Sequence, residues 1–201
     1  MPCIHRFVND LNPNEPLKYL FIGTFNPSLD RPQNDNANWF YGRQYNDFWF
    51  IMPQVFGHPS LMHRNFRTNR DFLIHWCNQN QIGLTDVIQS INDANINNEH
   101  HREIILGVND NAFDIFNEII PTDIAAIINA NVETLCGVYL TRYEHTLLPN
   151  GIINNLWTGI KNICFNLNID CSDLVTPSRQ YRQLSRIQKL NDWTRTIKIC
   201  T

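Results

Sequence analysis

The feature of this sequence that most constrains its fold is a short apolar run that stops at a glycine and a polar loop. Lys18 to Ile22 is rich in β-forming residues and is followed by Gly23, which is typical of a buried parallel strand. Residues 23–45 hold two prolines, a second glycine and many Asn and Asp residues, so this loop cannot be regular for long. Open α/β sheets place ligands at the carboxyl ends of their strands. We therefore expect a functional site here.

Strand and helix patterns alternate along the rest of the chain. We predict strands at 83–88, 132–136 and 170–175, and helices at about 46–56, 68–78, 110–119, 137–147 and 152–167, with a last helix after Pro177. The polar stretch 90–102 is predicted to be irregular, and 104–106 to be a short strand or the approach to a helix. The alternation predicts an α/β fold, a three-layer αβα sandwich with a short, mostly parallel central sheet.

Length and composition point to one compact unit. The chain has 201 residues and 43% hydrophobic residues, enough for one domain over 1–201 with a sizeable core. Its longest apolar runs, at 17–22 and 125–128, are far shorter than the roughly 20 residues that span a bilayer. The first residues do not have the apolar stretch of a signal peptide. We expect a cytoplasmic monomer with no membrane partner.

The six cysteines carry no metal-binding pattern. None belongs to a C-x-x-C pair and none has a histidine at zinc-ligand spacing, so we expect no metal and no other cofactor. Their scatter along the chain predicts reduced thiols, several of them buried, as in a reducing compartment. Local disulfides are the alternative.

Charge is distributed unevenly. The net charge of -3 counts against a nucleic-acid partner, because phosphate contacts dominate DNA affinity. Residues 176–201, however, hold six basic residues and one acidic residue, a charge of +5 that leaves about -8 for the remainder. This segment is either a local basic binding surface or an ordinary solvated helix face.

The loop after the first strand begins with residues suited to hydrolysis. Its sequence is Gly23, Thr24, Phe25, Asn26, Pro27 and Ser28. An Asn offers an acceptor and two donors and does not titrate, and backbone N–H groups of such a turn can bind an anion. The alternative is an Asx turn closed by proline.

This segment resembles the first active-site motif of the uracil-DNA glycosylase superfamily, especially the mismatch-specific branch, whose motif reads G-x-N-P-G. The resemblance implies that Asn26 orients the attacking water and that the flanking residues of the motif bind the base. The chain departs from the motif by one extra residue before Asn26 and by Ser28 in place of the second glycine.

The aromatic segment that follows is similar to an aromatic, then N-x-F-W, segment of the mismatch-specific and deoxyinosine-specific branches. The resemblance implies that Phe40 or Tyr41 stacks on a flipped base, and that Asn46 takes part in catalysis or base recognition. Phe48 and Trp49 fit a helix core better. Asn46 fits a helix N-cap equally well.

Residues 83–88, GLTDVI, are similar to a strand of the same superfamily. Asp86 would lie at the carboxyl end of that strand. It could act electrostatically on a sugar cation or cap the next loop, and the sequence gives no reason to assign it as the water activator.

A third segment resembles the second motif of the superfamily, a strand followed by a Pro/Ser-rich turn that enters the minor groove. Thr176 stands where the family has Asn or His. The resemblance implies that the turn and the residues after it bind DNA through phosphate contacts and by filling the gap of the flipped nucleotide. A simple N-capped basic helix is the alternative. The DNA-binding residues implied are Thr176, Pro177, Ser178, Arg179, Tyr181 and Arg182.

Together the three segments imply a monofunctional DNA glycosylase that flips and hydrolytically excises a deaminated base, uracil or hypoxanthine, from DNA. No lysine stands in them, so we expect no Schiff-base step. Two other functions stay open: a DNA-binding member of the same fold that does not cut, and a nucleoside hydrolase.

Overall fold

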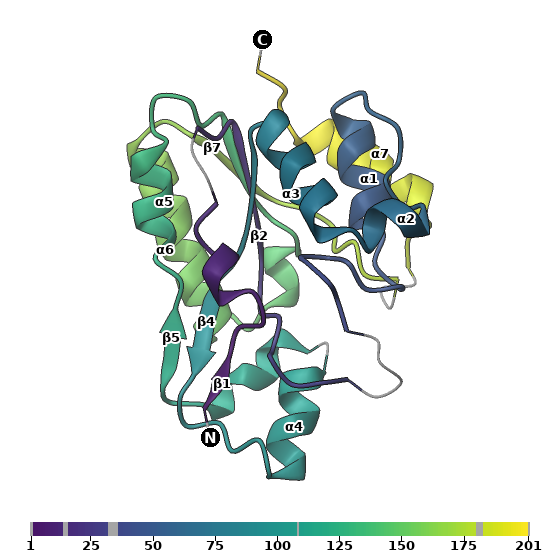
Figure 1. Ribbon diagram of the computed structural model, residues 1–201. Helices are drawn as coiled ribbons and strands as arrows, with labels where there is room; N and C mark the ends of the chain where they lie inside the picture. The colour runs from purple at the N-terminus through teal and green to yellow at the C-terminus, as the bar shows by residue number, and fades with distance from the viewer. Residues whose placement is uncertain (1, 14–15, 32–35, 108, 180–182, 201) are drawn as a thin grey trace.

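The computed structural model describes residues 2–13, 16–31, 36–107, 109–179 and 183–200 (Figure 1). Its main sheet has four parallel strands in the order β3, β2, β6, β7. These are β2 (Tyr19–Gly23), β3 (Ile82–Asp86), β6 (Gly137–Leu140) and β7 (Asp170–Asp173). The predicted parallel sheet is confirmed.

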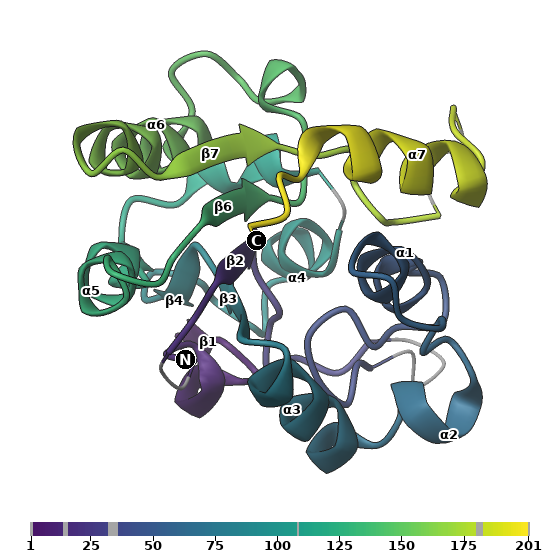
Figure 2. The ribbon, with the colours of Figure 1, turned by 90° about the horizontal axis from the view of Figure 1, so that it is seen from above.

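Alternate side chains of β2 supply the two faces of this sheet, as strand geometry requires. Tyr19 and Phe21 belong to one hydrophobic core, and Leu20 and Ile22 to the other. Helices cover both faces, which gives the expected three layers (Figure 2). The first core is covered by α1 (Phe48–Val55), α3 (Arg70–Gln79) and α7 (Arg186–Thr196), and the second by α5 (Ile124–Ala130) and α6 (Ile152–Asn166).

A small antiparallel sheet, which the sequence did not predict, adjoins the main one. It consists of β1 (Cys3–Ile4), β4 (Ile88–Ile91) and β5 (Ile119–Pro121) in the order β1, β4, β5. Only Val87 separates β3 from β4. The strand predicted at 83–88 is confirmed up to Asp86 and wrong beyond it, because the chain leaves one sheet at Asp86 and enters the other at Ile88.

The segment between β4 and β5 is more regular than expected. Helix α4 (Glu99–Leu106) begins where the Asn98 side chain accepts a hydrogen bond from the N–H of His101, so the prediction of an irregular stretch at 90–102 fails at its end. Residues 104–106 finish this helix. The helix predicted at 110–119 is a 3₁₀ turn (Asp110–Ile115) followed by β5.

Strand β6 corrects another prediction. We expected a strand at 132–136 and a helix over 137–147, but the strand is Gly137–Leu140. Its pairing with β2 and β7 buries Val138, Tyr139 and Leu140, and this tertiary pairing decides between strand and helix where a short apolar run cannot. The short elements η1 (Val8–Asp10), α2 (Arg64–Arg67) and η4 (Glu144–Thr146) complete the described secondary structure.

The prediction of reduced cysteines was wrong for one pair, because Cys136 and Cys200 form a disulfide. Two tyrosines of the main sheet hold the same tail: the N–H of Cys200 donates to Tyr19 Oη (2.8 Å), and the N–H of Lys198 donates to Tyr139 Oη (3.2 Å). The segment after α7 is thus fastened to the sheet at the start of β6. Cys3, Cys77, Cys164 and Cys171 are free thiols.

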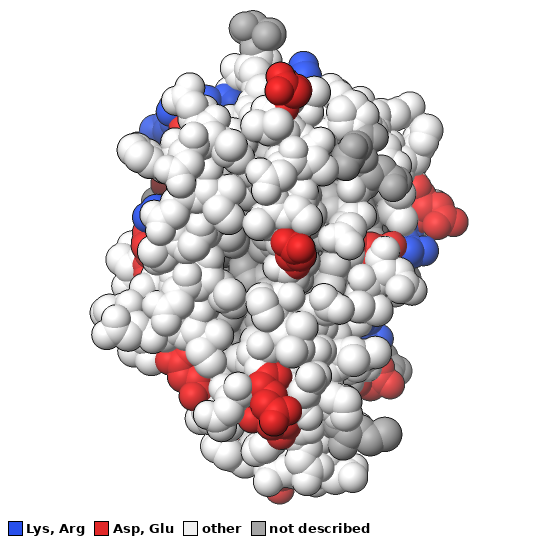
Figure 3. Space-filling view, turned by 90° about the vertical axis from the view of Figure 1, so that its left-hand side faces the viewer, with Lys and Arg blue, Asp and Glu red and all other residues white. Residues whose placement is uncertain are grey.

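The side of the molecule that carries α5 and β5 is acidic. Asp and Glu side chains are spread over this face, while Lys and Arg lie mainly at its edges (Figure 3). This distribution agrees with the excess negative charge of the chain outside its C-terminal segment. Among the residues that the structure describes, no helix has both the length and the apolar character needed to cross a membrane.

The disulfide closes a long loop, with a sequence separation of 64. Replacing Cys136 or Cys200 by Ser is expected to lower the free energy of unfolding by about 2–4 kcal/mol, because the unfolded chain regains the freedom of that loop. Urea unfolding measures the change. The double variant should lose no more than either single variant, since each removes the same bond. Six titratable thiols in denatured, unreduced protein would contradict the disulfide.

Candidate functional site

A pocket of about 180 Å³ lies at the carboxyl edge of the main sheet. Gly23 ends β2, Asp86 ends β3 and Thr141 directly follows β6, and all three residues line it. Pockets for drug-sized ligands measure roughly 300–1,000 Å³, so this one suits a small group such as a single base. The other lining residues are Thr24, Phe25, Asn26, Arg31, Tyr41, Arg43, Tyr45, Asn46, Ile105, Gly107, Asp110, Phe113, Arg142, Thr176, Pro177 and Ser178.

The structure brings the three sequence segments together. The N–H of Asp47 donates to the carbonyl of Pro177 (2.9 Å), and Asn46 forms an isolated β-bridge with Ser178. The helix start after the aromatic segment therefore lies against the turn of the third segment. Nine of the site residues expected from the sequence line the pocket: Gly23, Thr24, Phe25, Asn26, Tyr41, Asn46, Thr176, Pro177 and Ser178.

Other expected site residues lie outside this lining. Phe40 is fully buried beside His5 and Trp39, so of the two aromatic residues expected to stack on a base only Tyr41 reaches the pocket. Pro27 forms an isolated antiparallel β-bridge with His5, and the N–H of Ser28 donates to the carbonyl of Ile4. These two residues fasten the loop to β1 and its neighbour.

The remaining expected DNA-binding residues follow the turn. Arg179 directs its Nε to Asp47 Oδ1 (2.7 Å), and its N–H donates to the carbonyl of Tyr45. Tyr181 and Arg182 lie outside the described residues.

Asn26 belongs to a buried polar chain. Its Nδ2 donates to Asp86 Oδ2 (2.7 Å), and the same oxygen lies 2.8 Å from His5 Nε2. Asp86 is 1% exposed and His5 also 1%, so two donors support a carboxylate that has almost no contact with water.

Gly23 makes room for this carboxylate. It lies opposite Asp86 in the parallel register of β2 and β3. A Cβ at residue 23 would lie 2.2 Å from Asp86 Oδ1 and 2.9 Å from Tyr41 Oη. Only glycine fits between the two side chains, which gives a steric reason for the residue that ends the first strand.

Tyr41 is held on two sides. Its ring stacks on Phe48 with 4.0 Å between centroids, and its hydroxyl is 3.0 Å from Thr141 Oγ1. Thr141 Oγ1 donates to the carbonyl of Ile22, so the Tyr41 hydroxyl is the donor of the pair. Burial, and then the nearby Asp86 carboxylate, raise the pKa of Tyr41 well above its usual value, which keeps that hydroxyl protonated.

Asn46 is not the N-cap of α1, which is Asp47, but its side chain contacts the start of that helix. Its Oδ1 accepts the N–H of Phe48 (2.9 Å) at the start of α1, and the residue also lines the pocket. Because the oxygen is directed to the helix, the amide Nδ2 is the group of this side chain that can donate to a ligand.

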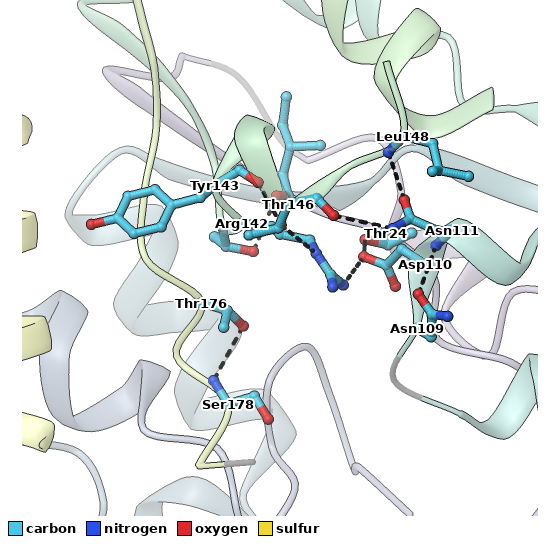
Figure 4. A network of polar contacts seen from close by, with 12 residues as sticks. Thr24, Asn109, Asp110, Asn111, Arg142, Tyr143, Thr146, Leu148, Thr176 and Ser178 are labelled. Atoms are coloured by element: carbon cyan, nitrogen blue, oxygen red, sulfur yellow. Dashed lines mark hydrogen bonds and ion pairs between the residues drawn. The ribbon is translucent and has the colours of Figure 1, made fainter. Parts of the chain in front are cut away.

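A second polar network includes the pocket residues Thr24, Asp110 and Arg142 (Figure 4). Asp110 Oδ2 accepts hydrogen bonds from Thr24 Oγ1 (2.7 Å) and from Arg142 Nη1, and Arg142 Nε donates to Thr146 Oγ1 (3.2 Å). The neighbouring Asn111 contacts the segment after β6: its Oδ1 accepts a hydrogen bond from the N–H of Leu148, and its Nδ2 donates to the carbonyl of Thr146. The network fixes the Arg142 guanidinium at the pocket, where an anionic group would meet a preoriented cation.

The turn at 176–178 is supported by a cluster of charges around Asp47. This carboxylate is 3% exposed and pairs with Arg179 and Arg186. Lys189 is also buried and donates to the carbonyl of Ser178; burial lowers its pKa, and the Asp47 charge opposes that shift. The cluster joins the start of α1, the turn and α7.

The same cluster bears on the two interpretations of the basic segment 176–201, a local basic binding surface or an ordinary solvated helix face. Besides the cations around Asp47, Lys198 pairs with Asp170 and Arg195 with Asp192. Part of the charge counted in the sequence is therefore paired within the fold.

Sequence reasoning did not find His5, Asp110, Arg31, Arg43 or Arg142. Arg142 stands two residues after a strand, which is a usable signal, but the wrong boundary of β6 placed it in a helix. His5 has no pattern around it, since its role depends on contact with a residue 81 positions away. Among the described residues no group of three or more His, Cys, Asp or Glu side chains could hold a metal ion.

The fold is similar to that of one solved structure with a glycosylase description. A solution NMR structure from Methanosarcina acetivorans, described as "a putative Uracil DNA glycosylase", superposes with a TM-score of 0.54, over 91% of this chain and 90% of that one, at 16% sequence identity. At this identity the likeness shows the fold alone. No family model matches the chain, and neither does any curated protein.

The Asp47 cluster predicts a large effect on stability. Asp47→Asn leaves the buried Lys189 and the half-buried Arg179 and Arg186 without their counter-charge. It is expected to lower the free energy of unfolding by about 3 kcal/mol. Asp10→Asn removes one partner of the more exposed Asp10–Arg70 pair and should cost less than about 1 kcal/mol. Denaturant unfolding of both variants measures the difference. Equal losses would contradict the importance of the buried cluster.

Proposed function

We propose that this protein is a monofunctional DNA glycosylase that flips a deaminated base, uracil or hypoxanthine, out of DNA and hydrolyses its glycosidic bond. The observation that carries the proposal is the convergence of three distant segments on one base-sized pocket at the carboxyl edge of the sheet. The fold shared with the Methanosarcina acetivorans structure supports it.

The polar groups of the pocket suit this reaction. Cleavage of a glycosidic bond passes through a cation-like sugar and releases the base with its electron pair. Asn26 would orient the water, and the Asp86 carboxylate beside it would stabilise the positive sugar. The Nδ2 of Asn46 and the Arg142 guanidinium are donors for the departing base.

The aromatic residues and the turn have matching roles. Phe25 and Tyr41 are the rings on the pocket wall that can contact a flipped base. The turn at Thr176, Pro177 and Ser178 would enter the minor groove, supported from behind by the Asp47 cluster. Arg179, Tyr181 and Arg182 are proposed to contact the DNA next to the turn. The acidic face that carries α5 and β5 (Figure 3) is unsuited to phosphate contact.

The test is base release from labelled duplexes that carry uracil, hypoxanthine, xanthine or a mismatched thymine, read as strand cleavage after alkali. Wild-type protein should release at least one base. Asn26→Ala and Asn46→Ala should each lower the single-turnover rate constant by about 100-fold, the usual effect of removing one group that acts in the transition state. Asn97→Ala, at an exposed position between β4 and α4, is the matched control and should keep the wild-type rate constant.

Three other results would replace the proposal. Tight, salt-dependent DNA binding without base release would identify a non-catalytic DNA-binding protein. Preferential cleavage of free deoxyuridine or deoxyinosine would identify a nucleoside hydrolase. Full activity in both asparagine variants would place the chemistry elsewhere in the molecule.

A further inference from the structure

The proposed function leaves one buried group unexplained, the histidine that precedes the pocket loop in the sequence. His5 lies among the rings of Phe7, Phe25 and Phe40, with centroid distances of 5.6–5.8 Å. The residue is 1% exposed. Both ring nitrogens have a hydrogen-bond partner: Nδ1 lies 3.0 Å from the backbone nitrogen of Phe7, and Nε2 lies 2.8 Å from Asp86 Oδ2.

These two partners determine which nitrogen carries the hydrogen. The Phe7 amide is a donor, so Nδ1 accepts, and the ring hydrogen is on Nε2. His5 therefore donates to Asp86. The backbone of residue 7 and the surrounding rings fix the direction of that hydrogen bond.

The orientation of Asn26 follows by the same reasoning. A carboxylate cannot donate, so the Asn26 atom next to Asp86 Oδ2 is the amide nitrogen. The Asn26 carbonyl oxygen is then turned away from Asp86, 3.4 Å from Arg43 Nη2. Asp86 thus determines the orientation of the Asn26 amide, the group that orients the water in the proposed function.

The two oxygens of Asp86 have different surroundings. Both hydrogen bonds described above go to Oδ2, while Oδ1 faces the Cα of Gly23. Asp86 lines the pocket with the small part of its surface that stays exposed. Neither hydrogen bond uses Oδ1, so this is the oxygen left to accept a hydrogen bond from a water held in the pocket.

We propose that Asp86 is the catalytic base of this site and that His5 is its positioning residue, an assignment that rests on the proposed glycosylase function. As the water oxygen bonds to C1′, the C1′–N bond breaks and its electron pair leaves with the base as an anion. One proton of the water passes to Asp86 Oδ1. His5 holds the carboxylate at the angle at which Oδ1 faces that water. Asn26 Oδ1 accepts a hydrogen bond from the second hydrogen, which stays on the oxygen and becomes that of the new C1′ hydroxyl.

The experiment measures single-turnover base release by wild type, Asp86→Asn, His5→Phe, His5→Gln and the double variant His5→Phe/Asp86→Asn, on the substrate that wild type cleaves best. Asp86→Asn can still accept from His5 Nε2 but cannot take a proton, and should lose about 100-fold or more. His5→Phe keeps a ring in the aromatic cage and removes the donor, and should lose about 10- to 100-fold, the effect of one hydrogen bond to a charged group. His5→Gln restores a donor and should recover part of that loss.

The double variant separates positioning from a general structural effect. If His5 acts only through the Asp86 carboxylate, His5→Phe has no further effect once Asp86 is Asn, so the two losses do not multiply. Affinity for DNA with an uncleavable nucleotide should stay within about threefold of wild type in all variants, because the change affects the chemical step. Asp71→Asn, at an exposed position in α3, is the control and should keep the wild-type rate constant.

A further variant tests the Asp86 carboxylate in case one of these variants fails to fold. Gly23→Ala keeps both Asp86 and His5 but adds a Cβ that would lie 2.2 Å from Asp86 Oδ1, so it displaces the carboxylate and should also lower the rate constant. If wild type cleaves and Asp86→Asn or Gly23→Ala stays within threefold of it, this assignment is overturned and the proposed function stands. Multiplying losses in the double variant overturn the role of His5. If wild type releases no base from any substrate, the proposed function itself fails.

Discussion

The parallel pairing of β2 with strands on both sides is the constraint on which the rest of the site depends. It brings residues far apart in the sequence to one edge of the sheet: Gly23 opposite Asp86, and Thr141 beside the end of β2. The carboxyl ends of parallel strands necessarily meet at the same edge. This pairing therefore brings three segments to one pocket: the loop after β2, the break between the two sheets and the segment after β6.

The sequence was sufficient for elements whose pattern and packing agree. The buried strand before Gly23, the helix after Asp47 and the long helix Ile152–Asn166 are close to their predicted bounds. The small antiparallel sheet was missed because its strands are two to four residues long and pair across the chain, and strands so short have no period to detect. Strand β6 was misplaced because its pairing with β2 and β7, rather than its own sequence, selects the extended form.

The part of the pocket formed by residues in local sequence motifs was predictable. The loop after β2, Tyr41, Asn46 and the turn at 176–178 were found from local sequence and resemblance. The side chains that orient them were not, since His5, Asp110 and Arg142 act through contacts with distant residues. Charge counting alone could not decide between a basic surface and a solvated helix face at the C-terminal segment, because the pairing of Arg179 and Arg186 with Asp47 is a property of the folded chain.

The close approach of Gly23 to Asp86 links two positions that lie 63 residues apart in the printed sequence. No side chain can be added to the first without moving the carboxylate of the second. Substitutions at the two positions are therefore sterically coupled. Among related chains, a larger residue at position 23 is compatible only with a shorter residue at position 86, so the pair should covary as residues in contact do.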